Sequence, residues 1–346
     1  MNKKLNIRLI SDEKLMQFFS DNNIPKFHLK QLNQWLWQKN VPSFNNMTNF
    51  SKELRELLNA HFYLPSVVIC KKIKSLDGTI KYSMKLEDDK LIEGVLIPSK
   101  KRLTACISSQ VGCSLTCTFC ATGTLNLKRN LNFSEIFEQV YIINEEAEKE
   151  YGKKITNIVY MGMGEPLLNY NNVIKSINHI TAKDGLAISP KRITVSTVGI
   201  AKMIKKLAND SIKFNLAISL HSAIQEKRNA LMPIGASISL EELKSSIQYF
   251  YRKTNKRITY EYILLNGVND TISDASALVK FSKISPCKIN LIEYNNVVGK
   301  EFVKSTPNAT TQFIEFIESN NLIVTIRRSK GEDINAACGQ LVNMTE

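Results

Sequence analysis

The sequence predicts an α/β protein, a partial β/α barrel preceded by a small helical domain and a short antiparallel β meander. Apolar residues recur at helical spacing up to about residue 62 and alternate with polar residues from about 66 to 97. Beyond about residue 100, strand-like runs alternate with helical patterns. We therefore expect a helical accessory domain over residues 1–64, a β meander over 65–99 and the barrel domain over 100–346.

The N-terminal segment has the spacing of amphipathic helices. Its apolar residues lie three or four positions apart in three groups, which are Leu15, Phe18 and Phe19, then Leu32, Trp35 and Leu36, then Leu54, Leu57, Leu58 and Phe62. No catalytic constellation appears here. We expect Trp35 and Trp37 to belong to the core of this domain rather than to stack on bases.

The next segment contains three alternating runs, which predict strands. Asp77-Gly78 separates the first two runs and is a strong hairpin signal, and Asp88-Asp89 supplies the second turn. A three-stranded antiparallel meander is therefore expected.

The barrel domain is predicted from seven strand-like runs that alternate with helical patterns. The runs are LTACISS, NIVYMGMG, RITVSTVG, FNLAISLH, RITYEYILL, CKINLIEYN and LIVTIRR. Such alternation implies a parallel sheet with crossover helices, and this many repeats favours a complete or partial barrel over an open sheet. Ser239, with Glu242 three residues on, predicts a capping box at one helix start.

Composition and charge favour a polyanionic partner. The chain carries 46 Lys and Arg against 32 Asp and Glu, and a net charge of +14 most often indicates nucleic-acid binding. Codons rich in A and T can also produce a lysine excess without any such role. No apolar run is long enough to span a membrane and the N-terminus has no signal-peptide core, so a cytoplasmic protein is expected.

Three of the seven cysteines form the pattern Cys113-x3-Cys117-x2-Cys120. Three thiolates this close can hold one cubic iron–sulfur cluster and leave one iron open to a ligand. A structural zinc site would need a fourth ligand at comparable spacing, and none follows. The odd cysteine count also argues against a disulfide scaffold. The pattern therefore predicts a cluster with an open iron.

Polar residues follow the other predicted strands. In a β/α barrel the catalytic groups lie at the carboxyl ends of the strands. The groups found there are Glu165, Ser196, Ser219, His221 and Asn295. Each of these residues, taken alone, also fits a structural role. Cys338, taken alone, is typical of a small residue that packs in the protein interior. Together with the cysteine loop they predict a ring of ligand-binding groups.

Six sequence blocks, in order, resemble the RlmN family of radical S-adenosylmethionine (SAM) enzymes. The blocks are SSQVGCSLTCTFCATG, MGMGEP, STVG, SLH, GVND and DINAACGQL. The resemblance covers nearly the whole chain, and KFHLKQLNQWLWQK and MTNFSKELRELL are similar to that family's helical RNA-handling domain. It implies a radical SAM barrel and the methylation of carbon 2 of an adenine in 23S ribosomal RNA and in some transfer RNAs.

The resemblance also assigns roles to residues by position. It implies that one 4Fe–4S cluster is bound by Cys113, Cys117 and Cys120. It implies that SAM is bound by Gly164, Glu165, Ser196, Ser219, Leu220, His221 and Asn295. The catalytic residues that it implies are Cys338 as methyl carrier, Cys106 as the cysteine that pairs transiently with the carrier, and Glu93 as proton acceptor.

The implied chemistry consumes two molecules of SAM per turnover. Carbon 2 of adenine is a poor nucleophile, whereas a Cys338 thiolate can take a methyl group from SAM by displacement. A second SAM, cleaved at the cluster, gives the radical that activates this methyl group. Cys106 would then release the RNA and leave a disulfide to be reduced. An electron donor such as flavodoxin or ferredoxin, no membrane and a monomeric chain are expected.

Basic clusters flank the predicted active face and are candidates to bind RNA phosphates. They are Lys100-Lys101-Arg102, Lys128-Arg129, Lys191-Arg192 and Arg327-Arg328-Ser329-Lys330. The chain departs from many family members at Glu293 and Asn296, where prolines are common.

Three alternatives remain open on the sequence. The sister Cfr family methylates carbon 8 with the same cluster and carrier, although Pro166, where that family typically has alanine, favours carbon 2. An iron–sulfur RNA-binding protein without methyl transfer would give Cys338 no role. A radical-free SAM methyltransferase would be expected to show a glycine-rich Rossmann turn, which the sequence lacks.

Overall fold

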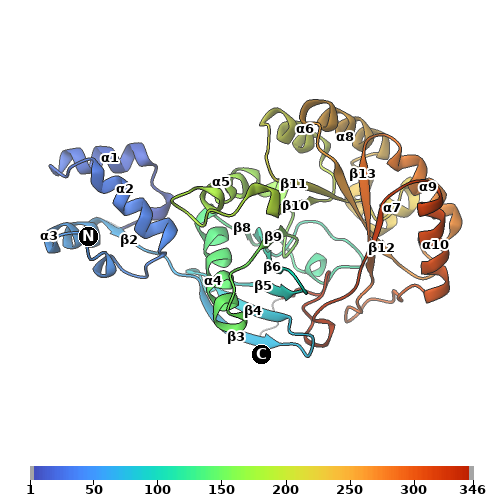
Figure 1. The fold of residues 1–346 in the computed structure, drawn as a ribbon, viewed down its shortest axis with the longest axis horizontal. Coiled ribbons are helices and arrows are strands. Elements are labelled where there is room, and N and C mark those ends of the chain that lie inside the picture. The colour runs from blue at the N-terminus through green and yellow to red at the C-terminus, as the bar shows by residue number, and fades with distance from the viewer. Residues whose placement is uncertain (1–3, 343–346) are drawn as a thin grey trace.

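A ten-stranded sheet organises the larger part of the molecule in the computed structural model, which describes residues 4–342 (Figure 1). The strand order is β14-β13-β12-β11-β10-β9-β6-β5-β4-β3. The strands are β3 (Val68–Lys74), β4 (Ile80–Lys85), β5 (Leu91–Pro98), β6 (Leu103–Ile107), β9 (Asn157–Tyr160), β10 (Ile193–Thr197), β11 (Asn215–Ser219), β12 (Ile258–Leu264), β13 (Cys287–Glu293) and β14 (Val324–Arg327). Within the described residues β3 and β14 are the edges, so the barrel is partial, as predicted.

The seven predicted barrel strands, β6 and β9 to β14, pair in parallel. The helices between them lie outside the curved sheet in Figure 1, and they are α4 (Phe133–Tyr151), α5 (Tyr170–Thr181), α6 (Ala201–Asn209), α7 (Gln225–Leu231), α8 (Leu240–Thr254), α9 (Ile272–Ser282) and α10 (Pro307–Ser319). Short elements punctuate the loops, and they are β7 (Gln110–Val111), β8 (Arg129–Asn130), η4 (Thr122–Thr124), η5 (Pro166–Asn169), η6 (Pro190–Arg192), η7 (Pro233–Ala236) and η8 (Glu332–Ile334). Crossover helices thus bury one face of the parallel strands and leave the inner face for side chains.

Side-chain caps mark several helix starts. Ser239 accepts a hydrogen bond from the Glu242 amide, as predicted, and this forms one half of the capping box. Complete boxes, in which the acidic residue also accepts from the cap amide, begin α4 at Asn132 and α9 at Thr271.

The predicted meander forms β3 to β5 and belongs to the same sheet, because β5 pairs antiparallel with β6. Both predicted turns are present. Gly78 adopts φ +85° and Asp89 adopts φ +59°, the left-handed conformations that tight hairpins need.

The segment after β14 crosses from one edge of the sheet to the other. Long-range hydrogen bonds attach it to the meander, and among them are those that join Ser75 to Asp333 (2.6 Å), Asp77 to the Gly331 amide (3.0 Å) and Lys81 to the Asn335 carbonyl (3.2 Å). Further along, Thr122 donates to the Leu341 carbonyl at 2.6 Å. The segment therefore covers the opening that the sheet leaves, and it carries Cys338 there.

The N-terminal residues form a separate lobe, at the left in Figure 1. Its elements are β1 (Leu5–Asn6), η1 (Ile7–Leu9), α1 (Asp12–Asp21), α2 (Phe27–Asn33), the π-helical turn η2 (Gln34–Gln38), η3 (Phe44–Asn46), α3 (Lys52–His61) and β2 (Phe62–Tyr63). Trp35 and Trp37 are buried, in agreement with the prediction. Trp37 also stacks on His179 of α5, with ring centroids 3.8 Å apart, so it joins the lobe to the barrel domain.

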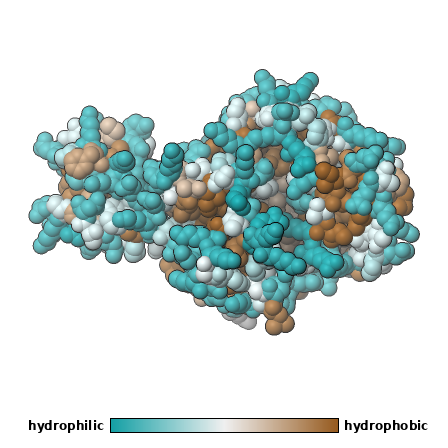
Figure 2. Space-filling view, in the orientation of Figure 1, coloured by the Kyte–Doolittle hydropathy of each residue, from teal (hydrophilic) through white to brown (hydrophobic). Residues whose placement is uncertain are grey.

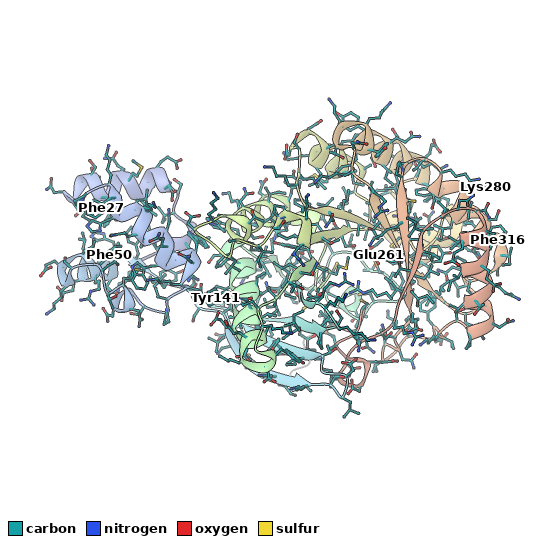
Figure 3. All side chains as sticks on the ribbon, in the orientation of Figure 1. Phe27, Phe50, Tyr141, Glu261, Lys280 and Phe316 are labelled. Carbon is teal, nitrogen blue, oxygen red and sulfur yellow. The ribbon has the colours of Figure 1, made fainter. Side chains whose placement is uncertain are left out.

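A buried ion pair anchors this lobe. Arg8 lies 2.6 Å from Glu138 of α4, and both side chains are almost fully buried. Tyr141, also on α4 and labelled in Figure 3, donates to the Lys39 carbonyl at 2.9 Å. Most of the molecular face in Figure 2 is hydrophilic, with a few apolar patches. No helix of residues 4–342 is long and apolar enough to cross a membrane.

Replacing Arg8 with Met should destabilise the protein by about 3–5 kcal/mol, because the Glu138 carboxylate would stay buried without its cation. The urea midpoint of unfolding, followed by circular dichroism, measures the loss. Lys52→Met is the control, since it breaks an exposed pair with Glu56 and should cost at most about 1 kcal/mol. Equal midpoints for the two variants would show that the buried pair does not hold the lobe.

Candidate active site

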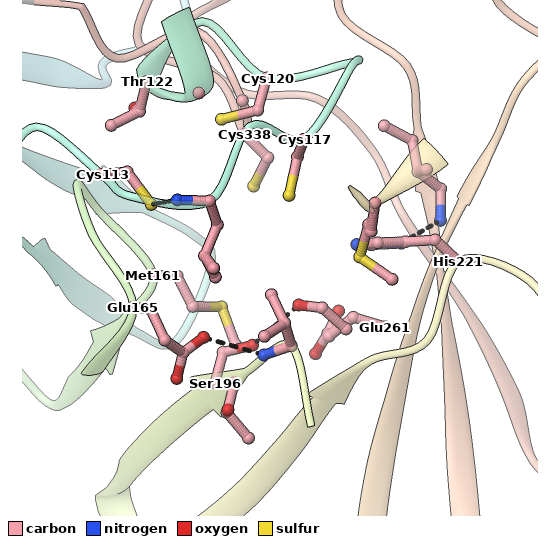
Figure 4. Close-up of a pocket in the computed structure, with 18 of the residues that line it drawn as sticks. Cys113, Cys117, Cys120, Thr122, Met161, Glu165, Ser196, His221, Glu261 and Cys338 are labelled. Carbon is pink, nitrogen blue, oxygen red and sulfur yellow. Dashed lines mark hydrogen bonds between the residues drawn. The ribbon is translucent and has the colours of Figure 1, made fainter. Parts of the chain in front are cut away.

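A cavity lies at the carboxyl ends of the parallel strands, and three thiols face it (Figure 4). Nine of the predicted site residues line this main cavity, and they are Cys113, Cys117, Cys120, Gly164, Glu165, Ser196, Ser219, His221 and Cys338. A second pocket, the side pocket, adjoins it and shares Arg327 and Cys338 with it. Two more predicted residues, Cys106 and Asn295, line the side pocket. The structure thus brings together eleven of the thirteen predicted residues.

The cysteine loop between β7 and β8 is tightly folded, and its three thiols all face the main cavity. The Cys120 amide donates to the Cys117 carbonyl at 3.2 Å, and the Thr118 amide donates to the Leu231 carbonyl at 3.0 Å. Gly123 lies against this turn, where an added Cβ would be 2.8 Å from the Cys117 carbonyl oxygen. A larger residue would therefore push the loop apart.

The three cysteines are partly buried, and for Cys113 and Cys117 burial is the main cause of a raised pKa. The pKa of Cys113 rises to about 11, and that of Cys117 is raised further. Buried thiols of this kind are protonated at neutral pH unless a metal binds them, since a coordinating thiol loses its proton. Within residues 4–342 no three His, Cys, Asp or Glu side chains are arranged around a single metal ion. A 4Fe–4S cluster instead binds each cysteine at a different iron.

A buried cation lies beside the thiols. Arg228 of α7 is fully buried and donates to the Val198 carbonyl at 2.6 Å, while its Nε and Nη1 have no partner among the described residues. Burial lowers its pKa to about 10, and the nearby Cys117 opposes this effect. An unpaired buried guanidinium is costly, so its position fits a cavity that receives an anionic group.

Glu165 forms the wall opposite the cysteines in Figure 4. Its carboxylate accepts hydrogen bonds from the amides of Val198 and Leu167, each at 2.9 Å, and it is 3% exposed. Burial raises the pKa of Glu165 to about 6, while the bond from Val198 counters the rise. Gly164 precedes it with φ +94°, where an added Cβ would lie 2.5 Å from Gln110. A fixed carboxylate of this kind suits an ammonium group.

Ser196, Ser219 and His221 continue the wall on the next two strands. The two serine hydroxyls are 3.3 Å apart. The His221 Nδ1 accepts from the Ile263 amide at 3.1 Å, so its ring proton is on Nε2. Burial lowers the pKa of His221 to about 3, and the ring is neutral at physiological pH.

Cys338 lies where the two cavities meet. Asn295 fixes the backbone there by donating its amide to the Cys338 carbonyl at 3.1 Å. Cys106 of β6 lines only the side pocket, and its pKa rises to about 12, mainly because it is buried and partly because Cys338 is near. Both thiols are free in the structure. Cys106 and Cys338 therefore line one pocket.

Two predicted site residues lie outside both cavities. Leu220 is buried, and its amide donates to the Glu261 carbonyl at 3.0 Å. Glu93 of β5 is buried 3.4 Å from Lys81 and accepts from the Val342 amide at 2.9 Å. Burial raises the pKa of Glu93, while Lys81 opposes the rise. Glu93 thus contacts the C-terminal segment that carries Cys338 rather than the cavity itself.

Glu261 was not predicted to be a site residue, and Arg327 was predicted to belong to a basic cluster that binds RNA phosphates. Both line the main cavity. The signal for Glu261 was a single acid inside the apolar run ITYEYILL. Arg327 was grouped with basic residues expected to bind phosphate, yet only its neighbours Arg328 and Lys330 are exposed. Arg129, from another such cluster, is instead paired with Asp88 and Glu135.

Known proteins resemble this chain over nearly its whole length. The radical SAM superfamily model matches residues 107–278, and a model described as the ribosomal RNA large subunit methyltransferase N-terminal domain matches residues 5–64. A protein of Cytophaga hutchinsonii is 52% identical over 98% of this chain and 93% of its own length. One of Flavobacterium psychrophilum is 49% identical over 99% and 98%. Both are named probable dual-specificity RNA methyltransferase RlmN.

A solved structure agrees with these relatives. The crystal structure of a radical SAM methyltransferase from Sphaerobacter thermophilus superposes with a TM-score of 0.91 at 32% identity. The match covers 97% of this chain and 99% of the other. Membership of the superfamily implies SAM and a 4Fe–4S cluster, and the three converging thiols and the unpaired Arg228 fit that cluster.

Cys117→Ala should prevent assembly of the 4Fe–4S cluster, because one iron would lose its ligand and the other two thiols cannot replace it. Iron and sulfide analysis after anaerobic reconstitution measures the loss. Cys70→Ala is the control, since Cys70 is exposed on β3 and lines neither cavity. Full iron content in Cys117→Ala would show that the cluster is bound elsewhere.

Proposed function

The chain belongs to the RlmN family of radical SAM RNA methyltransferases, and on this premise we propose that it methylates carbon 2 of an adenine in 23S ribosomal RNA and in transfer RNAs. One observation carries the proposal. The three thiols of the cysteine loop and the single thiol of Cys338 line the same cavity. A cluster-binding site and a methyl carrier are therefore within reach of one bound SAM.

When bound, the cluster and SAM supply a methyl group and a 5′-deoxyadenosyl radical. Cys113, Cys117 and Cys120 would hold the cluster. Glu165 would bind the ammonium group of SAM, because its carboxylate is fixed by two amides and has no cation of its own among the bonds described. Ser196, Ser219, His221 and the backbone at Gly164 would complete the SAM site, with two molecules consumed per turnover.

Cys338 would accept the methyl group and then carry it to the RNA. A thiolate is nucleophilic enough for this displacement, whereas carbon 2 of adenine is not. Arg327 lines the same two cavities as Cys338, and the pKa of Arg327 is raised chiefly by the Cys338 thiolate. Asn295 lines the side pocket and not the main cavity, and it would act by holding the segment that carries Cys338 through its hydrogen bond to the Cys338 carbonyl.

Cys106 would resolve the product. Its pKa of about 12 keeps the thiol protonated and makes it a poor competitor for the methyl group. To release the product, Cys106 would lose its proton and attack the Cys338 sulfur, which breaks the bond between that sulfur and the transferred carbon. The bonding electron pair would stay on the carbon, which takes up a proton to become the methyl group, and the Cys106–Cys338 disulfide would then be reduced. Glu93 is the proposed proton acceptor, and its buried carboxylate, with a raised pKa, contacts the carrier segment at Val342.

RNA would reach the site over a basic surface. Arg328, Ser329 and Lys330 line the side pocket, and Arg328 and Lys330 are exposed, so they are suited to hold phosphates beside a target base that has left its stack. We further propose a cytoplasmic monomer that receives electrons from a flavodoxin or ferredoxin. No observation favours carbon 8, since each relative reported above is named RlmN.

The carrier role predicts a methyl group on Cys338 after anaerobic incubation of cluster-loaded protein with SAM. Mass spectrometry of the C-terminal tryptic peptide, residues 331–346, detects it, and the peptide containing Cys287 is the internal control. Cys338→Ala should keep the cluster and SAM binding but form no methylated RNA. Turnover by Cys338→Ala would exclude the carrier mechanism. Nuclease digestion of the RNA that the wild-type protein has methylated identifies whether the methyl group is on carbon 2 or on carbon 8 of the adenine.

Cys106→Ala should stop the reaction after methyl transfer to the base has begun, because Cys120, the other thiol that lines the side pocket in the described residues, would be bound to the cluster and could not release Cys338. The expected product is a covalent protein–RNA adduct, visible as a shifted band on a denaturing gel. Cys287→Ala, at a buried thiol of β13 outside both cavities, should release product normally. Free product from Cys106→Ala at the wild-type rate would remove its resolving role.

A further inference from the structure

A buried carboxylate in the main cavity has an oxygen without a partner. Glu261 is the middle residue of β12 and is 3% exposed, and Figure 3 shows it among the strands inside the barrel. Its Oε1 accepts from the Asn290 amide at 2.9 Å, whereas its Oε2 has no hydrogen-bond partner among the described residues. In Figure 4 the side chain lies across the cavity from Cys117 and Cys338.

This arrangement requires a hydrogen-bond donor from outside the chain. An unsatisfied buried carboxylate oxygen is costly, and such groups in native proteins commonly mark a ligand. The roles assigned above to Glu165, Ser196, Ser219 and His221 do not use Glu261. A donor on a molecule that enters the main cavity would satisfy this oxygen.

Arg327 supplies a hydrogen-bond donor in the same cavity, whereas Glu261 supplies an acceptor. It ends β14, lines both the main cavity and the side pocket, and has Nη1 3.3 Å from the Met161 sulfur. A thioether is a weak acceptor, so this contact leaves the guanidinium able to donate elsewhere. The charge of Arg327 also lowers the pKa of Glu261, against the larger effect of burial, so the two groups are near one another.

One edge of adenine matches this pair. Its N1 is an acceptor, the neighbouring 6-amino group is a donor, and N1 is bonded to carbon 2. When carbon 2 lies beside Cys338, a donor next to Cys338, such as Arg327, therefore faces a ring nitrogen that is bonded to carbon 2. If that nitrogen is N1, the amino group lies beside it and requires an acceptor.

We propose that Glu261 and Arg327 select the target base, with Glu261 accepting from the 6-amino group of adenine and Arg327 donating to N1. The inference rests on the proposed function, because it needs the base to enter beside Cys338. It makes both residues specificity determinants of the methyl transfer. Guanine and hypoxanthine present the reverse pattern, a donor at N1 and an acceptor at O6, and would leave both side chains facing like groups.

SAM is the other molecule in the cavity that could approach Glu261. Its ribose hydroxyls both donate and accept, so a ribose diol, like an adenine edge, has groups for Glu261 and for Arg327. The adenine of SAM carries the same edge as the target base. The experiment must therefore separate the base of the RNA from the base of SAM.

Glu261→Gln provides the test, because the amide can keep the Asn290 bond through its oxygen and turn a donor toward the cavity. The probe is the shortest RNA hairpin that the wild-type protein methylates, made with adenosine or with inosine at the target position. The wild type should bind the adenosine hairpin about tenfold more tightly than the inosine hairpin. For Glu261→Gln the ratio should fall to about one or reverse, because the new amide can donate to O6.

Ser219→Ala is the matched control, since it alters the predicted SAM wall and should keep the tenfold base preference. The affinity of each variant for SAM is measured in parallel by equilibrium dialysis. An unchanged base ratio in Glu261→Gln would overturn the proposal, and a weakened affinity for SAM with that ratio unchanged would assign Glu261 to SAM instead. Failure of the wild type to methylate any RNA would contradict the proposed function and not this inference alone.

Discussion

The hydrogen bonds between the C-terminal segment and the β meander decide where the chemistry can occur. Ser75, Asp77 and Lys81 of the meander bind Asp333, Gly331 and Asn335 of the segment, and so join the two open edges of the sheet. Without these contacts Cys338, eleven residues beyond β14, would have no fixed position. A partial barrel leaves room for a large RNA substrate, and the C-terminal segment places the Cys338 thiol at the same opening.

Buried charge gives the cavity its selectivity for ligands. Glu165, Glu261, Arg228 and Arg327 each cost free energy when they are left without a complementary group in a low-dielectric site. They are held in place by backbone amides and carbonyls or by neighbouring side chains, so they do not reorganise when a ligand arrives. The cavity is thus less favourable empty than filled, which is the condition for tight binding of charged and polar cofactors.

Local patterns predicted the fold better than they predicted the site. Strand alternation gave the seven parallel strands, and Asp77-Gly78 and the cysteine spacing are signals within a few residues. The environment of Glu93 was not predictable in this way, because its contact with Val342 joins positions 249 apart in the chain. The same reason explains Arg129, whose partner Asp88 lies in the meander, and Arg327, whose cavity position depends on the strand order. The resemblance to a family supplied residue roles, but not these contacts.

Cys106 and Cys338, two of the thiols that line the side pocket, show how different environments can give identical groups different roles. Cys338 lines both cavities, whereas Cys106 lines only the side pocket and is 6% exposed. A methyl donor bound near Glu165 therefore meets Cys338 first. Cys106 keeps its proton because burial raises its pKa to about 12. Under the proposed mechanism, position would select Cys338 as the carrier and burial would hold back Cys106, so the order in which the two thiols react would follow from the geometry of the pocket rather than from the chemistry of cysteine.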